Sequence, residues 1–415
     1  MIRTQTFPCA LSKAEADALN QESGRLYTRT LVEHYRIYRH TGHWLPPASL
    51  EKLIDFYDAQ DGRERLLHAH SIDAAEQGFP KACKTARACR TLGMNTRFPH
   101  KRKYWRTTIW KNTGIRQTDQ TLLLALARGR APIRVNLPSH LNDLPKDSCV
   151  EMRLVWDKAS RHYYWHLVVD DKQPNAEPPG EQTMAGDLGE IHPITVTDGK
   201  EAIVFSARAL RSVKQYTNKR LAALQKLQSS KKKKSLRWRK LQRRKNRFLA
   251  QQKRRTRDME HKVSRAVVNY AVTRKVGTLA LGDVRNIADG KRLNAKSQQK
   301  VSNWSHGKVR DYITYKGESV GIKVELVNEK NTTKTCPSCG KPHKPQGRIY
   351  RCPVCGFVSH RDVVGAANIL SRHRYGEVGQ VKPPAEIKYR HPFGKLAFGT
   401  GKRSRLDTAQ VACGV

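Results

Sequence analysis

The sequence has few acidic residues and no long apolar run. Of 415 residues only 36 are Asp or Glu, against 79 Lys or Arg, so the formal net charge is +43. A bilayer-spanning helix needs roughly 18 to 20 consecutive apolar residues, and no segment supplies them. The first residues also lack the apolar centre of a signal peptide. We therefore expect a cytoplasmic protein with no membrane partner.

The large positive charge predicts a polyanionic partner. Lys and Arg side chains that displace counterions from nucleic acid gain binding free energy. The 38% hydrophobic content is low but compatible with two or three folded domains. Nine cysteines are present, an odd total that argues against a disulfide scaffold in a chain without a secretion signal. Five of them are scattered and four are clustered near the C-terminus.

The first 170 residues combine helical and strand-like segments. Residues 1–8 read as a strand, and Ser12 with Glu15 forms a capping box for a helical stretch that extends to about residue 100. Between 115 and 168, short runs rich in β-branched and aromatic residues predict antiparallel strands. The Pro-rich segment 171–183 predicts a linker between domains, and residues 371–415 predict a flexible basic tail.

A basic segment without any acid lies between these domains and the cysteines. Residues 208–257 contain 21 Lys or Arg and no Asp or Glu, with leucines at helical spacing, which predicts two antiparallel helices joined near 229–234. So many unbalanced cations favour a nucleic-acid contact over a merely solvated face. Aromatic side chains among the cations could stack on bases. The predicted nucleic-acid-binding residues are Lys231, Lys232, Lys233, Lys234, Arg237, Trp238, Arg239, Lys240, Arg243, Arg244, Lys245 and Arg247, together with Tyr104 and Trp105 of a second basic segment.

The clustered cysteines form two Cys-x-x-Cys knuckles. CPSCG at 336–340 and CPVCG at 352–356 each place two sulfurs so that they can bind one ion, and the Gly after each second Cys permits a tight turn. Four thiolates suit tetrahedral coordination of one structural Zn²⁺ ion. The predicted ligands are Cys336, Cys339, Cys352 and Cys355.

Two carboxylates stand where a nuclease would place metal ligands. Phosphodiester hydrolysis commonly uses two Mg²⁺ ions held by acids at strand ends and at the start of a packed helix. Asp187 follows an apolar strand, and Asp362 begins a predicted helix with an apolar face. Each residue alone would suit a turn or a helix cap. Together with the adjacent zinc motif they predict a catalytic pair.

At this point the sequence resembles the TnpB family, the transposon-encoded RNA-guided nucleases ancestral to type V CRISPR effectors. The motifs, over residues 184–370, are an Asp-Leu-Gly strand exit, the basic hairpin, the double knuckle and Arg-Asp-x-x-x-Ala-x-Asn-Ile. The resemblance implies an α/β RuvC-like nuclease domain with an RNase H fold at 184–370, containing the basic helical hairpin 207–276 and the zinc ribbon 333–358. It also implies an all-β wedge barrel from 1–10 and 105–170, interrupted by a helical recognition insert at 11–104.

One position departs from the family pattern. The strand after the hairpin normally supplies a catalytic Glu, but here Gly282 holds that place and Asp283 follows it. A Gly cannot bind Mg²⁺. The best substitute is Glu329, at the end of the next strand, which would neighbour the strand of Gly282 at about 5 Å. Asp283, the lesser candidate Glu190 and an inactive site remain as alternatives.

The resemblance implies an RNA-guided, Mg²⁺-dependent DNA endonuclease of a mobile element, acting at the prokaryotic nucleoid. Asp187, Glu329 and Asp362 would hold two catalytic Mg²⁺ ions. The partners would be a guide RNA from the transposon end and double-stranded target DNA with a short adjacent motif. A nuclease-inactive, RNA-guided repressor remains open because of Gly282, and a strand-transferring transposase fits the motifs less well.

Overall fold

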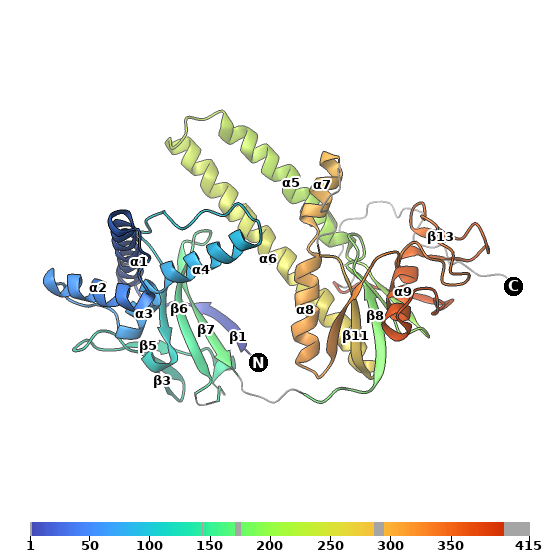
Figure 1. Ribbon diagram of the computed structural model, residues 1–415, viewed down its shortest axis with the longest axis horizontal. Helices are drawn as coiled ribbons and strands as arrows, with labels where there is room; N and C mark the ends of the chain where they lie inside the picture. The colour runs from blue at the N-terminus through green and yellow to red at the C-terminus, as the bar shows by residue number, and fades with distance from the viewer. Residues whose placement is uncertain (1, 143, 146, 171–175, 286–293, 394–415) are drawn as a thin grey trace. The chain divides into compact units, whose positions relative to one another are not determined.

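The structure, a computed structural model, describes residues 2–393 except 143, 146, 171–175 and 286–293. The chain forms two compact units, residues 1–173 and 174–415 (Figure 1). The first part of the predicted linker, residues 171–175, and the end of the predicted tail, residues 394–415, lie outside the described residues. Among the helices of the described residues, none is both long enough and apolar enough to cross a membrane.

The first unit builds two antiparallel sheets around one core. The larger sheet has the order β1-β7-β6-β2 and the smaller has the order β3-β4-β5. Trp110, Met152 and Leu167 of the larger sheet and Leu122 of the smaller share this core. The strands are β1 (Ile2–Pro8), β2 (Thr108–Lys111), β3 (Ile115–Thr118), β4 (Thr121–Leu124), β5 (Ile133–Asn136), β6 (Cys149–Asp157) and β7 (His162–Asp170), with 3-10 turns η1 (Asn112–Gly114) and η2 (Ser139–Leu141).

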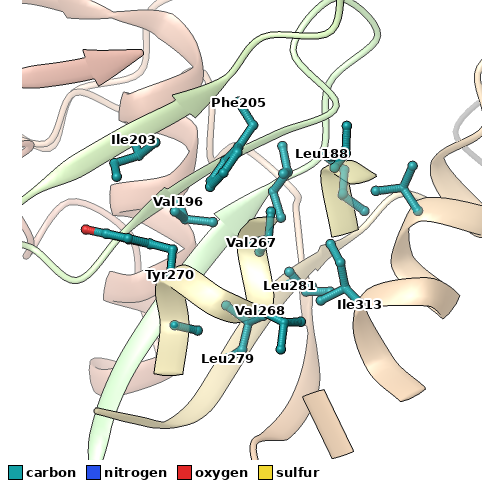
Figure 2. Packing of buried hydrophobic residues seen from close by; sticks show 14 of the residues in the cluster. Leu188, Val196, Ile203, Phe205, Val267, Val268, Tyr270, Leu279, Leu281 and Ile313 are labelled. Atoms are coloured by element: carbon teal, nitrogen blue, oxygen red, sulfur yellow. The ribbon is translucent and has the colours of Figure 1, made fainter. Parts of the chain in front are cut away.

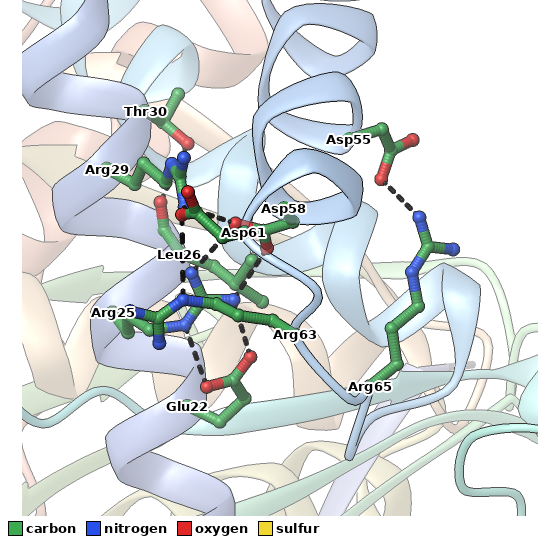
Figure 3. Close-up of polar contacts among 10 residues, drawn as sticks. All are labelled: Glu22, Arg25, Leu26, Arg29, Thr30, Asp55, Asp58, Asp61, Arg63 and Arg65. Carbon is green, nitrogen blue, oxygen red and sulfur yellow. Dashed lines mark hydrogen bonds and ion pairs between the residues drawn. The ribbon is translucent and has the colours of Figure 1, made fainter.

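Four helices are inserted between β1 and β2. They are α1 (Lys13–Thr41), α2 (Pro47–Gln60), α3 (Ala69–Glu76) and α4 (Gly78–Thr91). Helix α1 starts at the predicted capping box of Ser12 and Glu15. Arg25 donates to both Glu22 and Asp58, and Arg29 donates to Asp58 (Figure 3). Because Asp58 lies on α2 and both arginines lie on α1, this charge network joins the two helices.

The second unit is built on a mixed six-stranded sheet of order β12-β11-β8-β9-β10-β15. Strands β8, β9 and β10 form an antiparallel meander, and β11 and β12 add to β8 in parallel. The strands are β8 (Gln182–Asp187), β9 (Ile194–Thr197), β10 (Ala202–Phe205), β11 (Val276–Asp283), β12 (Lys323–Asn328) and β15 (Ile387–Arg390). Strand β8 begins at Gln182, so the predicted linker ends slightly too late.

Helices cover both faces of this sheet. The helices of this unit are α5 (Arg208–Ser229), α6 (Leu236–Thr273), α7 (Ala295–Asn303), α8 (His306–Glu318) and α9 (Arg361–Tyr375), of which α6, α8 and α9 pack on the sheet. On one face, Val267 of α6 and Ile313 of α8 pack with Leu279 and Leu281 of β11 (Figure 2). On the other face, α9 packs through Ala367, Ile369 and Leu370. The short strands β13 (Ile349–Arg351) and β14 (Val358–His360) precede α9.

The prediction of a flexible tail from residue 371 is wrong for the part that the structure describes. Helix α9 continues to Tyr375, and Ser371 is buried and accepts the backbone N–H of Gln380 at 2.9 Å. Residues Ile387–Arg390 form β15, which pairs in parallel with β10. Strand β15 has only four residues and three of its side chains are exposed, so its sequence carries little hydrophobic pattern that would predict a strand. It is ordered by its pairing with β10.

Candidate functional site

Asp187 ends β8, between the two strands that flank it in the sheet. Its side chain is buried, and burial raises its pKa well above the usual range. The charges of Glu329 and then Asp362 raise the pKa further. A buried carboxylate with two acids nearby is unstable as an anion unless a cation joins it.

Glu329 lies against Gly282, on the neighbouring strand. Strands β11 and β12 are parallel, with Gly282 opposite Val327, and Glu329 follows the end of β12. A Cβ atom added to Gly282 would lie 2.7 Å from both Cγ and Cδ of Glu329. The Glu329 side chain therefore fills the space that a side chain at position 282 would enter. Its Oε1 is buried without a hydrogen-bond partner, and burial, followed by the charge of Asp283, raises its pKa to about 7.

Asp362 lies in the first turn of α9. Arg348 donates to its carboxylate at 3.0 Å. One turn further, Gly365 allows α9 to approach β8, because a Cβ atom there would lie 2.9 Å from Cγ of Asp187. The structure thus brings Asp187, Glu329 and Asp362 together from two strand ends and one helix start. Three carboxylates, one with an orphaned buried oxygen, are a donor set that fits Mg²⁺.

The two alternative acids have cationic partners of their own. Asp283 accepts from Nε of Arg285 at 2.9 Å, which lowers its pKa. Glu190 pairs with Arg211 of α5 at 3.2 Å. Neither charge is among those that raise the pKa of Asp187, which come from Glu329 and Asp362. Of the three candidate acids, Glu329 is the one whose charge raises the pKa of Asp187.

Two histidines beside Asp362 were missed by the sequence analysis. His192 lies in the loop between β8 and β9, and His360 caps α9. One nitrogen of each ring and one oxygen of Asp362 all lie within 4.8 Å of one another. Burial lowers the pKa of His192 to about 4. No local motif distinguishes a single His in a loop, so only the fold could reveal this neighbourhood.

The four clustered cysteines come together as predicted. Sγ of Cys336 lies 3.6 Å from Sγ of Cys355, and Sγ of Cys339 lies 3.6 Å from Sγ of Cys352. Gly340 and Gly356 have positive φ values of 69° and 71°, the left-handed conformation that the tight turns require. The four sulfurs are consistent with a structural zinc site.

The zinc knuckles are attached to α9 by Asn368. Its fully buried side chain donates to the carbonyl of Thr332 at 2.7 Å and to that of Thr335 at 2.8 Å. It also accepts the backbone N–H of Gly379 at 2.9 Å. The same helix carries Asp362, so the ribbon and the acidic site share one support.

The basic segment forms the predicted helical hairpin. Helices α5 and α6 pack through buried Leu224, a Gln228–Gln242 hydrogen bond of 2.8 Å and an edge-on contact of Tyr216 with Phe248. Among the described residues, no ion pair involves the predicted binding cations of this hairpin. Ten of these cations are exposed, and Trp238 and Lys245 are partly covered. The unbalanced charge therefore faces solvent.

Tyr104 and Trp105 lie beside a basic groove of the first unit. The groove has a volume of about 570 Å³ and includes Arg25, Arg29 and Arg102 in its lining. Tyr104 is 76% exposed, and Trp105 donates to the hydroxyl of Tyr163 at 3.1 Å. Exposed aromatic rings beside cations suit stacking on nucleic-acid bases.

Comparisons with known proteins match the two motif-bearing regions. Residues 166–288 match the OrfB (IS605) family, described as "Probable transposase", and residues 306–369 match the Cas12f1-like TNB domain. A TnpB-like protein of Methanocaldococcus jannaschii is 31% identical over 139 residues, which cover 33% of this chain and 49% of that protein. The CRISPR-associated endodeoxyribonuclease Cas12f1 of Sulfoacidibacillus thermotolerans is 31% identical over 113 residues, covering 26% of this chain and 25% of that protein.

Among solved structures, the Cas12f1–sgRNA–target DNA complex has a similar fold. The TM-score is 0.57 at 13% identity, covering 86% of this chain and 83% of that one. The chain spans about half the length of the first curated relative and a quarter of the second. Both regions are present in the order expected from the sequence motifs, so the chain carries an OrfB (IS605)-like region followed by a Cas12f1-like TNB domain and is similar to TnpB proteins over these residues.

Proposed function

We propose that this chain is an RNA-guided, Mg²⁺-dependent DNA endonuclease of a mobile element. The observation that carries the proposal is the Glu329 carboxylate, which fills the space beside Gly282 and whose charge raises the pKa of Asp187. The sheet order, with a meander extended by two parallel strands, supports an RNase H-like nuclease domain at 184–370. The two sheets of the first unit and their four-helix insert support the wedge and recognition assignments.

Asp187, Glu329 and Asp362 would hold the two Mg²⁺ ions. When bound, the ions would activate the attacking water and stabilise the leaving oxygen. The residues themselves supply a buried, preorganised acidic site, because β8, β12 and α9 place the carboxylates before any cation arrives. Arg348 balances part of this charge through Asp362. The orphaned Oε1 of Glu329 gives that residue an unused coordination position.

The guide RNA and the double-stranded target would bind mainly through their backbones. In this mode of recognition, base pairing reads the sequence while the protein contacts phosphates and a short adjacent motif. The exposed cations of the α5–α6 hairpin suit the phosphates, and the groove beside Tyr104 suits stacked bases. The solved relative of similar fold is a complex with sgRNA and target DNA.

Plasmid cleavage with copurified RNA and Mg²⁺ tests the catalytic assignment. We expect Glu329→Gln and Asp187→Ala each to slow cutting by at least ~100-fold, the scale seen when a group that stabilises developing charge is removed. Target binding should persist. The matched controls Glu190→Gln and Asp283→Asn remove acids that pair with Arg211 and Arg285, and they should cut nearly as well as wild type.

A variant that carries the carboxylate at position 282 instead of position 329 gives a more specific test. Gly282→Glu combined with Glu329→Gly exchanges the two residues and frees the space for the new side chain, so we expect it to recover part of the cutting lost in Glu329→Gly alone. Full cutting by Glu329→Gln would contradict the assignment. Guided binding without cutting in the wild type would favour the repressor, the alternative that Gly282 raises.

A further inference from the structure

The cluster of His192, His360 and Asp362 is not explained by three carboxylates binding Mg²⁺. His192 is 5% exposed, yet its Nδ1 is buried without a hydrogen-bond partner. A buried polar atom left unpaired destabilises the folded protein unless a bound partner satisfies it. A neutral imidazole carries one nitrogen lone pair that can bind a metal. His192 belongs to a group in which one nitrogen of each ring and one oxygen of Asp362 lie within 4.8 Å of one another, and the proposed function already assigns Asp362 to a cation.

The two histidines have different roles in this group. Nδ1 of His360 accepts the backbone N–H of Asp362 at 3.2 Å, as the cap of α9. Its proton in the neutral ring is therefore on Nε2, which cannot then bind a metal. Nδ1 of His192 makes no such hydrogen bond. The two ring centroids are 5.7 Å apart in an edge-on arrangement, so the ring of His360 packs against the ring of His192 and restricts its orientation.

A cation that binds Asp362 would have to displace Arg348 from the carboxylate or share the carboxylate with it. It pairs with Asp362 at 3.0 Å, but its side chain is 44% exposed and can turn toward solvent. Arg208 is a second positive neighbour of His192, on α5. A divalent ion at Asp362 must bind despite repulsion from these two positive charges. Asp187 and Glu329 supply the additional negative charge.

We propose that His192 is a direct imidazole ligand of the divalent cation that Asp362 holds. This inference rests on the proposed function and adds a nitrogen ligand to its metal site. Imidazole suits Zn²⁺ and other transition metals, whereas Mg²⁺ prefers an all-oxygen shell. The imidazole therefore raises the affinity for ions that accept nitrogen, such as Co²⁺ or Mn²⁺, above that of a site made of carboxylates alone, while the three carboxylates still fit Mg²⁺. The four-cysteine cluster is separate, since thiolates select softer ions than Mn²⁺.

Pulsed electron paramagnetic resonance of bound Mn²⁺ provides the test. The sample is the untagged full-length chain, freed of nucleic acid and given one equivalent of Mn²⁺. We expect modulation from an imidazole ¹⁴N nucleus in the wild type and its loss in His192→Ala and His192→Asn. His360→Asn is the matched control, because Asn also caps a helix, and it should keep the modulation. Mn²⁺ affinity should fall about 10-fold or more without His192, the scale for groups that support a metal.

The outcomes separate the inference from the proposed function. Bound Mn²⁺ without ¹⁴N modulation in the wild type would overturn the role of His192 and leave an all-oxygen site intact. Modulation that survives both His192 variants but disappears in His360→Asn would overturn the choice between the rings. Mn²⁺ binding unchanged in Asp362→Asn would contradict the cation site itself, and with it the proposed function.

Discussion

At the scale of single residues, a carboxylate that follows one strand fills the space beside a glycine on the neighbouring strand. Gly282 lies opposite Val327 in the parallel pair β11–β12, and neighbouring strands are about 4.8 Å apart. A Glu side chain is long enough to cross that distance, provided that the neighbouring position is small. A Cβ atom at position 282 would clash with the Glu329 side chain, so this side chain already occupies the space beside the glycine.

The sequence predicted some site residues and not others, for physical reasons. The cysteines were recognisable because the spacing within each knuckle fixes their geometry, whereas Asp187 and Asp362 were singled out by the motifs around them. Glu329 was predictable only as a neighbour of Gly282, through the expected strand order. His192 could not be predicted, because its position beside Asp362 depends on how a loop after β8 meets the start of α9.

Glu76 makes the stability of the first unit depend on pH. It is 2% exposed at the end of α3, and burial, followed by the charge of Asp55 and other acids, raises its pKa to about 8. Because the folded pKa exceeds the unfolded value of about 4.3, this residue's contribution to stability is fully present below pH ~4 and is lost as the pH rises through 8. We expect Glu76→Gln to stabilise the unit by roughly 2 kcal/mol more at pH 8 than at pH 5.

Urea unfolding followed by tryptophan fluorescence measures this effect, since most of the tryptophans lie in the first unit. Wild type and variant are compared at both pH values, so that titrations elsewhere in the chain cancel. An equal difference in unfolding free energy at pH 5 and pH 8 would show that Glu76 is ionised in the folded protein.

At the scale of elements, the α5–α6 hairpin was predictable and the C-terminal strand was not. The hairpin has strong local signals in its helical leucine spacing and in a polar turn between the helices. The first helix ends at Ser229 and the second begins at Leu236, which brackets the predicted turn. Strand β15 depends on an edge of β10 that no local pattern reveals.

The exposed cations of the hairpin should control the salt dependence of nucleic-acid binding. Each lost phosphate contact reduces the slope of log K against log salt by about 0.9. We expect the double change Arg243→Gln and Arg244→Gln to reduce the slope by up to about 2 for an RNA–DNA heteroduplex of about 20 base pairs. Filter binding at several salt concentrations measures it.

The matched control changes two arginines whose charge is already balanced. Arg65 pairs with Asp55 and Arg130 pairs with Glu64, both at 2.8 Å or less. Arg65→Gln with Arg130→Gln should leave the slope nearly unchanged. Equal slopes for the hairpin variant and the wild type would remove the hairpin from the phosphate-contacting surface.

At the scale of the whole molecule, the second unit joins its zinc ribbon to the acidic site. Asn368 holds the start of the ribbon on α9, and Arg348, just before β13, reaches Asp362. The two-unit division followed from the Pro-rich boundary in the sequence. How the ribbon contacts the helix could not be predicted, because these hydrogen bonds join residues that are more than 30 positions apart.

We therefore expect loss of the zinc to disturb the acidic site as well. Elemental analysis should find about one zinc per chain, lost from Cys352→Ser after dialysis against chelator, because a small ribbon with little core folds only around its metal. Guided cleavage should fall with it. Cys89→Ser, which changes a cysteine outside the cluster, should retain both zinc and cleavage. A zinc content unchanged by Cys352→Ser would contradict the ligand assignment.

The central claim is that Asp187, Glu329 and Asp362 bind the same pair of divalent ions. The most direct measurement is an anomalous difference map from crystals of the protein soaked in Mn²⁺. We expect anomalous peaks within direct coordination distance of all three carboxylates, with Glu329 still lying over Gly282. Peaks bound by Asp187 and Asp362 alone, with Glu329 turned away from them, would contradict it.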